Sequence, residues 1–284
     1  MSQVVQLYSN PASGSYNPRR MRALTAAFEA QGATVLHTPC GAEPPPVREE
    51  TTHVCVAGGD GTVRQVAGAI ARSGRVVTLS IYPAGTVNLL AMEAGYPRRP
   101  DEFARQVLSS EPRRPHYPVT LGDGYFFACA GVGPDSLAVG RVSPAMKRRF
   151  GRVAYALAVI GQLFAWPRHS IMLTCGDREL ACEAFYVAKG RYYAGRWSFA
   201  RDARVGEPVL HVVALRTARR RDYARFVWAL VSGADAAALG NVDVLTCTSL
   251  SVACGEPLPI QADGDIVGVL PATMTVSEAP LVFC

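Results

Sequence analysis

The first 95 residues carry two alternating patterns of hydrophobic and polar positions. Short apolar runs that end in glycine-rich or polar turns are typical of buried strands, and between them apolar residues recur at helical spacing. The pattern predicts strands over residues 4–8, 33–37, 54–57 and 76–81, and helices over 18–31, 62–72 and 87–94. This alternating order favours a parallel sheet whose ligand site lies at the carboxyl ends of its strands.

The pattern changes after residue 96. A proline- and arginine-rich stretch around one predicted helix, 101–109, leads into strand signals that are separated by Gly, Pro and Asp. These strands are predicted over 125–130, 170–175, 180–188, 209–215, 242–254, 259–262 and 273–276, with helices over 151–166 and 222–239. We therefore expect an α/β domain over residues 1–120, followed by a second domain over 121–284 that is an antiparallel β-sandwich.

The composition is that of a folded protein rather than a disordered one. Of the 284 residues, 49% are hydrophobic and 18% are charged, which allows a sizeable core in each domain. The eight cysteines show no C-x-x-C spacing, so neither a zinc site nor a disulfide framework is indicated. The amino terminus lacks the features of a signal peptide, and the most apolar stretch, 153–166, is shorter than a bilayer-spanning helix. We expect a cytoplasmic protein.

The net charge of +6 favours an anionic partner, which is a nucleotide, a nucleic acid or an anionic membrane surface. Basic residues are clustered at 19–20, 98–99, 113–114, 147–149 and 219–221. Each cluster alone fits a solvated surface, but together they favour peripheral contact with the inner face of a membrane. There is no recognition helix or aromatic-interleaved RNA motif, so we expect no nucleic-acid partner. The sequence leaves a homodimer open.

The turn 58–62, with the sequence GGDGT, joins a predicted strand to a helix that is expected to begin at Thr62. Glycines let the backbone approach a ligand closely, and the unpaired N–H groups at a helix start favour an anion. The carboxylate of Asp60 favours a cation between acid and anion, and Mg²⁺ with phosphate is the obvious pair. Two further small polar turns, 10–14 and 85–88, follow other strands and could reach the same phosphate chain. Taken alone, the GGDG stretch fits a plain strand-to-helix turn equally well.

Six short motifs occur in order along the chain. Three lie in the first domain: NPASG at 10–14, GGDGT at 58–62 and PAGTVN at 83–88. Three lie in the second domain: AGVGPD at 130–135, KGRYYAG at 189–195 and QADGD at 261–265. Together they resemble the diacylglycerol kinase catalytic family, which includes bacterial lipid kinases, sphingosine kinases and ceramide kinases. The resemblance covers nearly the whole chain.

This resemblance implies a nucleotide-binding α/β domain followed by a β-rich lipid-binding domain, with the active site in the cleft between them. The implied activity is transfer of the γ-phosphoryl group of ATP to a hydroxyl of a diacylglycerol-like or sphingoid lipid, assisted by Mg²⁺. Asp60 would hold the catalytic Mg²⁺. The implied nucleotide-binding residues are Asn10, Ser13, Gly14, Thr38, Gly58, Gly59, Asp60, Gly61, Thr62, Gly85, Thr86 and Asn88.

The family's catalytic base is the glutamate of a late D-G-E motif, and the resemblance puts Asp265 at that position. Aspartate can make the same proton transfer, although its side chain is one methylene shorter. From the residues alone, Asp263-Gly264-Asp265 favours a hairpin turn without a catalytic role. With the resemblance, proton transfer by Asp265 is the favoured interpretation.

The sequence departs from the family pattern at further positions, one of them Ala200-Arg201-Asp202-Ala203, where the family has alanine-proline before its D-A pair. Leu89 stands where many members have an aspartate, and Gly206-Glu207-Pro208 stands where some members bind a structural Mg²⁺ through a D-D-G loop. Glu207 is the candidate ligand for that second ion, although Pro208 stiffens the loop. Two alternatives stay open: an NAD kinase-like enzyme that phosphorylates a soluble dinucleotide, and a non-catalytic nucleotide- or lipid-binding module.

Overall fold

The computed structural model describes residues 3–11, 16–41, 43–109, 113–134, 136–137, 166 and 168–284. It divides the chain into two compact units, one formed by Met1–Pro118 with Ala279–Cys284 and one formed by Val119–Glu278. The sequence assigns everything from residue 121 onward to the second domain, whereas the structure returns residues 279–284 to the first unit.

The first unit is built on one six-stranded sheet with the order β2-β1-β3-β4-β18-β5. The predicted parallel sheet is confirmed, because four strands pair in parallel: β1 (Val4–Ser9), β2 (Thr34–Pro39), β3 (His53–Gly58) and β4 (Thr78–Pro83). β18 (Leu281–Phe283) pairs parallel with β4, and β5 (Arg114–His116) pairs antiparallel with β18. The carboxyl-terminal residues thus complete a sheet that begins at residue 4.

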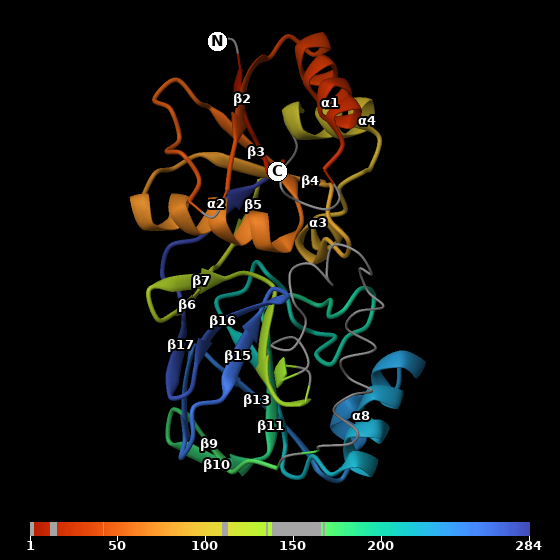
Figure 1. Cartoon of the computed structure of the whole chain (residues 1–284), viewed down its shortest axis with the longest axis vertical. Helices are drawn as coiled ribbons and strands as arrows, with labels where there is room; N and C mark the ends of the chain where they lie inside the picture. The colour runs from red at the N-terminus through yellow and green to blue at the C-terminus, as the bar shows by residue number, and fades with distance from the viewer. Residues whose placement is uncertain are drawn as a thin grey trace. The chain divides into compact units, whose positions relative to one another are not determined.

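Helices alternate with these strands (Figure 1). They are α1 (Pro18–Ala30), α2 (Asp60–Ser73), α3 (Leu89–Glu93) and α4 (Pro100–Leu108). The side chain of Asn17 caps α1 by accepting from the N–H groups of the first turn, and α1 buries Met21, Leu24 and Phe28. Phe28 packs edge-on against Phe103 of α4, with ring centroids 6.1 Å apart. An amphipathic face therefore holds α1 in place.

The strand order of the first unit reverses between β1 and β3, because β2 lies beyond β1 and β4 lies beyond β3. In open parallel sheets, ligands bind outside the carboxyl ends of the strands at such a reversal. The segments that leave β1 and β3 at this point start at Asn10 and Gly59. The topology therefore brings the first two motifs to one edge of the sheet.

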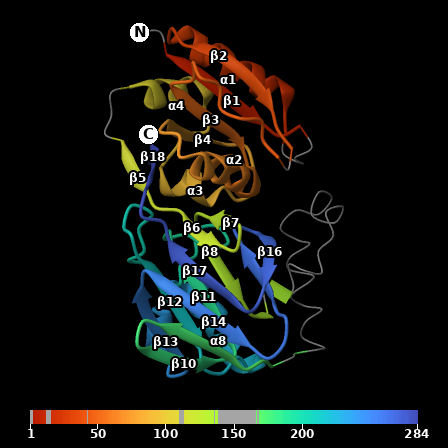
Figure 2. The ribbon, with the colours of Figure 1, turned by 90° about the vertical axis from the view of Figure 1, so that its left-hand side faces the viewer.

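The second unit contains two six-stranded sheets, β10-β9-β14-β17-β6-β7 and β13-β12-β11-β8-β15-β16, which we call the β9 sheet and the β11 sheet (Figure 2). Their described strand pairs are all antiparallel, which confirms the predicted sandwich class. The strands are β6 (Val119–Leu121), β7 (Gly124–Phe126), β8 (Cys129–Val132), β9 (Ile171–Cys175), β10 (Arg178–Cys182), β11 (Ala184–Ala188), β12 (Leu210–Leu215), β13 (Val242–Cys247), β14 (Ser249–Cys254), β15 (Pro259–Ala262), β16 (Asp265–Val269) and β17 (Ala272–Val276).

Three predicted strands, 125–130, 180–188 and 242–254, are wrong as single strands, because each passes from one sheet to the other. β10 belongs to the β9 sheet and β11 to the β11 sheet, with Glu183 between them. Thr248 likewise separates β13 from β14, and Phe127 and Ala128 separate β7 from β8. An apolar run stays apolar when a strand changes sheets at a bend, so hydrophobicity alone does not reveal the change.

The predicted helix 222–239 is shorter in the structure. α8 (Arg220–Ser232) ends at Gly233, whose φ of 72° is left-handed, and a 3₁₀ turn, Ala236–Ala238, follows. Phe226 of α8 stacks on Tyr186 of β11 at 5.2 Å between ring centroids. The predicted helix 151–166 falls almost wholly outside the described residues. Across the described part of the chain, every helix is too short or too polar to traverse a bilayer.

Candidate nucleotide site and acidic hairpin

The turns after β3 and β4 touch backbone to backbone. Gly58 pairs with Pro83 across the two strands, and the Gly58 carbonyl accepts a hydrogen bond from the N–H of Ala84 at 3.4 Å. A Cβ atom on Gly85 would lie 2.3 Å from the Cα of Gly59, so no side chain fits there. Two motifs that are separate in sequence are therefore parts of one assembled structure.

The helix that follows GGDG begins earlier than the sequence predicts. α2 starts at Asp60, with Gly59 as an N-cap that has no side-chain cap, and its first helical bond runs from Val63 N–H to the Gly59 carbonyl at 3.1 Å. The predicted start at Thr62 is wrong because the helix dipole favours a carboxylate in the first turn. The N–H groups of Asp60, Gly61 and Thr62 precede the first helical bond, which is the arrangement that binds anions.

The carboxylate of Asp60 links this helix to the next one. Its Oδ1 accepts from the N–H of Leu90 at 3.3 Å, at the start of α3. Desolvation by burial raises the pKa of Asp60, and backbone N–H groups of Leu89, Leu90 and Asn88 oppose that rise. A desolvated carboxylate of this kind would be stabilised by a bound cation.

Asn88 closes the turn after β4. It is buried in a left-handed conformation with a φ of 61°. Its Oδ1 accepts from Gly85 N–H at 2.6 Å, and its Nδ2 donates to the Gly85 carbonyl at 2.8 Å. This structural role adds to the predicted contact with a nucleotide, which stays a prediction. Thr86, in the same turn, is exposed.

Thr38 lies inside β2, because the strand continues two residues beyond the predicted end at residue 37. Its hydroxyl accepts from Gln6 Nε2 at 3.2 Å and donates to the Leu36 carbonyl at 3.3 Å. Gln6 is fully buried, donates to the hydroxyl of Tyr8 at 2.9 Å and accepts from the hydroxyl of Thr51 at 2.9 Å. Sequence reasoning missed this network, although an amide within the apolar run VVQLY was the available signal.

The remaining predicted nucleotide residues are partly covered. Thr62 is buried beneath Gly58, because a Cβ atom on Gly58 would lie 2.7 Å from the Cβ of Thr62. Asn10 is half-buried directly after β1. Ser13 and Gly14 lie outside the described residues, and so does Asp135 of the AGVGPD motif.

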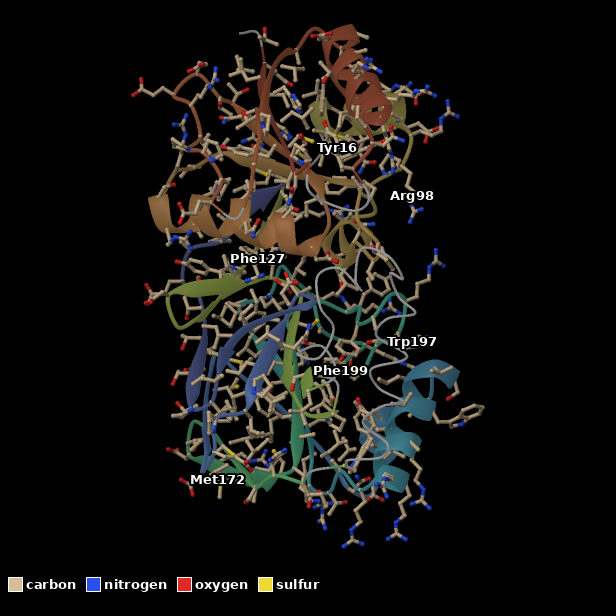
Figure 3. The ribbon with its side chains drawn as sticks, in the orientation of Figure 1. Tyr16, Arg98, Phe127, Met172, Trp197 and Phe199 are labelled. Carbon is tan, nitrogen blue, oxygen red and sulfur yellow. The ribbon has the colours of Figure 1, made fainter. Side chains whose placement is uncertain are left out.

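The second acidic motif forms a tight hairpin between β15 and β16. Asp263 and Gly264 form its two-residue turn with φ values of 48° and 87°, the positive pair that a type I′ turn requires. The buried carboxylate of Asp263 accepts from the N–H groups of Phe127 (labelled in Figure 3) at 2.9 Å, Ala128 at 2.9 Å and Cys129 at 3.2 Å. Asp263, which the sequence marked only as a turn residue, therefore fixes the bend between β7 and β8.

Asp265 occupies a different environment from Asp263. It is the first residue of β16, pairs with Ala262 of β15 and is half-buried. The hairpin that the residues alone favour is therefore present, and it does not exclude a chemical role for Asp265. Its assignment as the base stays a prediction.

Glu207 is not arranged as a metal ligand. The residue is exposed, and its backbone carbonyl accepts a hydrogen bond from Lys189 Nζ at 2.5 Å. In the ranges that the structure describes, no three His, Cys, Asp or Glu side chains are gathered for a metal. The residues present do not fit the second, structural Mg²⁺ that the resemblance allowed.

The predicted basic clusters differ in their surroundings. Arg20 lies over the ring of Tyr82 at 4.8 Å and donates to its hydroxyl at 2.8 Å. Arg99 pairs with two neighbouring acidic side chains at 3.1 and 3.3 Å. The cluster 219–221 is exposed at the start of α8, whereas 147–149 lies outside the described residues. Structural contacts inside the first unit thus account for two of these arginines.

Models of two protein families match the chain and together cover most of it. The diacylglycerol kinase catalytic domain matches residues 7–117. The YegS C-terminal NAD kinase beta sandwich-like domain matches residues 128–282, which is more than half of the chain. The two matches follow the division into an α/β unit and a sandwich unit.

Individual relatives carry related names. A protein of Pseudomonas aeruginosa (strain UCBPP-PA14) named "Probable lipid kinase YegS-like" is 30% identical over 162 residues, which is 56% of this chain and 53% of that protein. The chain thus spans about half the length of the curated relatives that it matches first. A "Diacylglycerol kinase" of Mycobacterium tuberculosis (strain CDC 1551 / Oshkosh) is 26% identical over 246 residues, 83% of this chain and 77% of that protein.

The fold has counterparts among solved structures. The crystal structure of a diacylglycerol kinase from Bacillus anthracis str. Sterne matches with a TM-score of 0.77 at 17% sequence identity, covering 99% of this chain and 96% of that one. At this identity, the likeness establishes the fold alone.

Proposed function

This chain belongs to the family in which a diacylglycerol kinase catalytic domain precedes a YegS-type β-sandwich domain, and from that premise we propose that it is an ATP-dependent lipid kinase. The reaction transfers the γ-phosphoryl group of ATP to a hydroxyl of a diacylglycerol-like or sphingoid lipid and releases ADP. The observation that carries the proposal is the backbone contact of Gly59 with Gly85 beside the N-terminus of α2.

The glycine turns are suited to hold the phosphate chain of ATP. The N–H groups of Asp60, Gly61 and Thr62 offer donors, and the close approach of Gly59 and Gly85 holds the turn after β4 beside them. Phosphoryl transfer depends mainly on positioning and charge neutralisation, which such a cradle supplies. Asn10, Thr38, Thr86 and Asn88 complete the proposed nucleotide set, together with Ser13 and Gly14 of the first motif.

The carboxylate of Asp60 fits a magnesium ion that travels with the nucleotide. Mg²⁺ is commonly held by one or two carboxylates, while phosphate oxygens and water fill its remaining positions. Desolvation of Asp60 makes a cation favourable there. When bound, the ion would neutralise charge on the β- and γ-phosphates. The chain's own contribution is to fix Asp60, through Leu90 N–H, at the start of α2.

Asp265 is the proposed base for the lipid hydroxyl. Its neighbour Asp263 holds the turn rigidly through three backbone N–H groups, so the first residue of β16 has a fixed backbone from which to act. General bases contribute when their position is well defined, which favours Asp265 over a side chain on a loose loop.

A lipid substrate requires contact with a membrane surface, and we propose that the exposed face of α8 makes it. Arg221 and Arg225 are exposed on this face, and Trp228 and Val231 are 71% and 48% exposed. The only acid of α8, Asp222, is buried and accepts from Thr217 Oγ1 at 2.9 Å. Arginines with an outward tryptophan suit the headgroup layer of an anionic leaflet.

Vesicle binding tests this surface. Cosedimentation with vesicles that contain phosphatidylglycerol should weaken as salt rises through the physiological range, and Trp228→Ser should weaken it further. Met172→Ser is the matched control, because Met172 is also an exposed apolar residue, at 40%, on a strand of the same unit (Figure 3). Salt-independent binding, or equal loss in both variants, would contradict the assignment of α8.

The activity itself is tested with labelled ATP. The purified protein is incubated with γ-labelled ATP and Mg²⁺, and either mixed micelles of diacylglycerol or sphingosine, or NAD⁺. Label that moves into the lipid supports the proposal. Label in NAD⁺ alone would support the second candidate, which the NAD kinase-like description of the sandwich domain favours. Transfer to neither acceptor would indicate a binding module and overturn both kinase assignments.

A further inference from the structure

Lys189 lies in an unusual place for a lysine. It directly follows β11, and none of its surface is exposed. Its Nζ donates to three backbone carbonyls, those of Arg204 at 3.1 Å, Val205 at 2.9 Å and Glu207 at 2.5 Å. Lysine is almost never fully buried, and burying an ammonium group is costly unless it is well hydrogen-bonded. The position therefore calls for a function.

The three acceptors belong to one short turn. The N–H of Glu207 donates to the Arg204 carbonyl at 3.1 Å, which closes the turn, and Pro208 follows. The guanidinium of Arg204 is engaged locally, because Nη1 donates to the carbonyls of Arg201 at 2.8 Å and Ala203 at 2.9 Å. Three carbonyl oxygens of the turn therefore converge on the Nζ atom of Lys189. Glu207, the acidic residue of the turn, is exposed.

Several carbonyl oxygens that converge on one point form the kind of ligand set that proteins use for hard cations such as Ca²⁺ and Mg²⁺. Here the ammonium group of Lys189 occupies the position where such a cation would lie. The segment between β11 and the turn packs against β11. Phe199 (Figure 3) is buried in this segment, and its ring centroid lies 5.5 Å from that of Tyr186. The ammonium is thus held in a fixed frame.

We propose that the ammonium group of Lys189 serves as a built-in cation for the turn 204–207, in place of a structural metal ion. The second unit then stays folded without a divalent cation. This inference concerns stability and does not require the proposed kinase activity.

The first experiment uses the wild-type protein. We expect that it retains no Mg²⁺ or Ca²⁺ through gel filtration, as measured by mass spectrometry of metals, and that EDTA leaves its thermal unfolding midpoint unchanged. A bound equivalent of metal, or a midpoint that falls in EDTA and returns with Mg²⁺, would overturn the proposal. This measurement needs no variant to fold.

The second experiment removes the charge. Lys189→Met keeps the length of the apolar stem but leaves the carbonyls without their donor, so the unfolding midpoint should fall by roughly 5 °C or more. Arg201→Met is the control, because it removes an exposed positive charge beside the same turn. Equal midpoints for the two variants would refute a specific role for Lys189.

The third experiment exchanges the ammonium for a metal. Lys189→Ala vacates the position and Gly206→Asp adds a carboxylate to the turn. We expect the midpoint of this double variant to rise when millimolar Mg²⁺ or Ca²⁺ is added, while that of the wild type does not. A double variant that folds and ignores both ions would overturn the equivalence of ammonium and metal.

Discussion

Among the turns that set aspartate beside glycine, Gly59-Asp60 in the first unit and Asp263-Gly264 in the second have different roles. In the first turn, close backbone approach decides. The φ of Gly59, −91°, is open to any residue, but a Cβ atom on Gly59 would lie 3.3 Å from the Cα of Gly85, and one on Gly85 only 2.3 Å from the Cα of Gly59. In the second, a Cβ atom added to Gly264 would meet no atom within 4 Å, and glycine is favoured there by a φ of 87°.

The aspartates differ in the same way. The side chain of Asp60 sits at a helix start and accepts from Leu90 N–H at 3.3 Å. The carboxylate of Asp263 is buried and receives three backbone N–H groups at 2.9 to 3.2 Å. Backbone N–H groups face both carboxylates. Desolvation still raises the pKa of Asp60, which suits it to a cation, whereas the three short backbone hydrogen bonds to Asp263 stabilise the fold. We therefore expect substitution of Asp60 to affect mainly activity and substitution of Asp263 to affect mainly stability.

The largest effect is expected at Asp60. Asp60→Ala should lower turnover by about 10³-fold or more, equivalent to about 4 kcal/mol, because the proposed magnesium carboxylate is lost. Thermal unfolding should change little. Asp60→Asn keeps an oxygen for Leu90 N–H and should lose activity equally, which separates charge from the contact with α3. An Ala variant with full turnover in the labelled-ATP assay would remove Asp60 from the site.

Asp263 should show the opposite pattern. Asp263→Ala removes the acceptor of three backbone N–H groups and should lower the free energy of unfolding by about 3 kcal/mol. Asp123→Ala, at an exposed position in the turn between β6 and β7, is the control and should cost little. Chemical denaturation monitored by circular dichroism measures both. Equal stabilities would show that the buried carboxylate contributes nothing.

Variants of Asp265, the residue directly after the second turn, test whether its carboxylate acts as the catalytic base. Asp265→Asn preserves size and the Asp-Gly turn, so stability should hold while kcat falls by about 10²-fold, equivalent to about 2.7 kcal/mol. Asp265→Glu restores the residue of the family motif and should keep or raise kcat. Both are measured with saturating ATP and a short-chain lipid acceptor. A fully active Asp265→Asn variant would mean that the hairpin has a structural role only.

The smallest of these effects is expected at Gly85. Gly85→Ala places a Cβ atom 2.3 Å from the Cα of Gly59 and should cost about 2 kcal/mol of stability through overpacking. Nucleotide affinity, measured by fluorescence titration, should fall with it. Gly240→Ala is the control, since no atom lies within 4 Å of its added Cβ. Unchanged nucleotide affinity in Gly85→Ala would place the phosphate away from the two glycine turns.

Local patterns in the sequence were enough to predict the class of each unit and the location of the glycine turns. Alternation of apolar runs with helical spacing is a local property, and it predicted a parallel sheet that includes β1, β3 and β4. The hairpin at Asp263-Gly264 is equally local, because a type I′ turn needs positive φ at both residues and Asp-Gly tolerates it.

Other features depend on contacts between residues that are distant in sequence, so local patterns do not predict them. Strands that change sheets at Glu183 and Thr248 keep an unbroken apolar pattern, so their bends are set by which sheet offers a partner. The return of β18 to β4 joins residue 281 to a strand that begins at residue 78. The role of a polar side chain likewise depends on its partners: Gln6 accepts from a side-chain hydroxyl, Asp263 accepts from backbone N–H groups and Lys189 donates to backbone carbonyls, all of residues distant in sequence or in another strand.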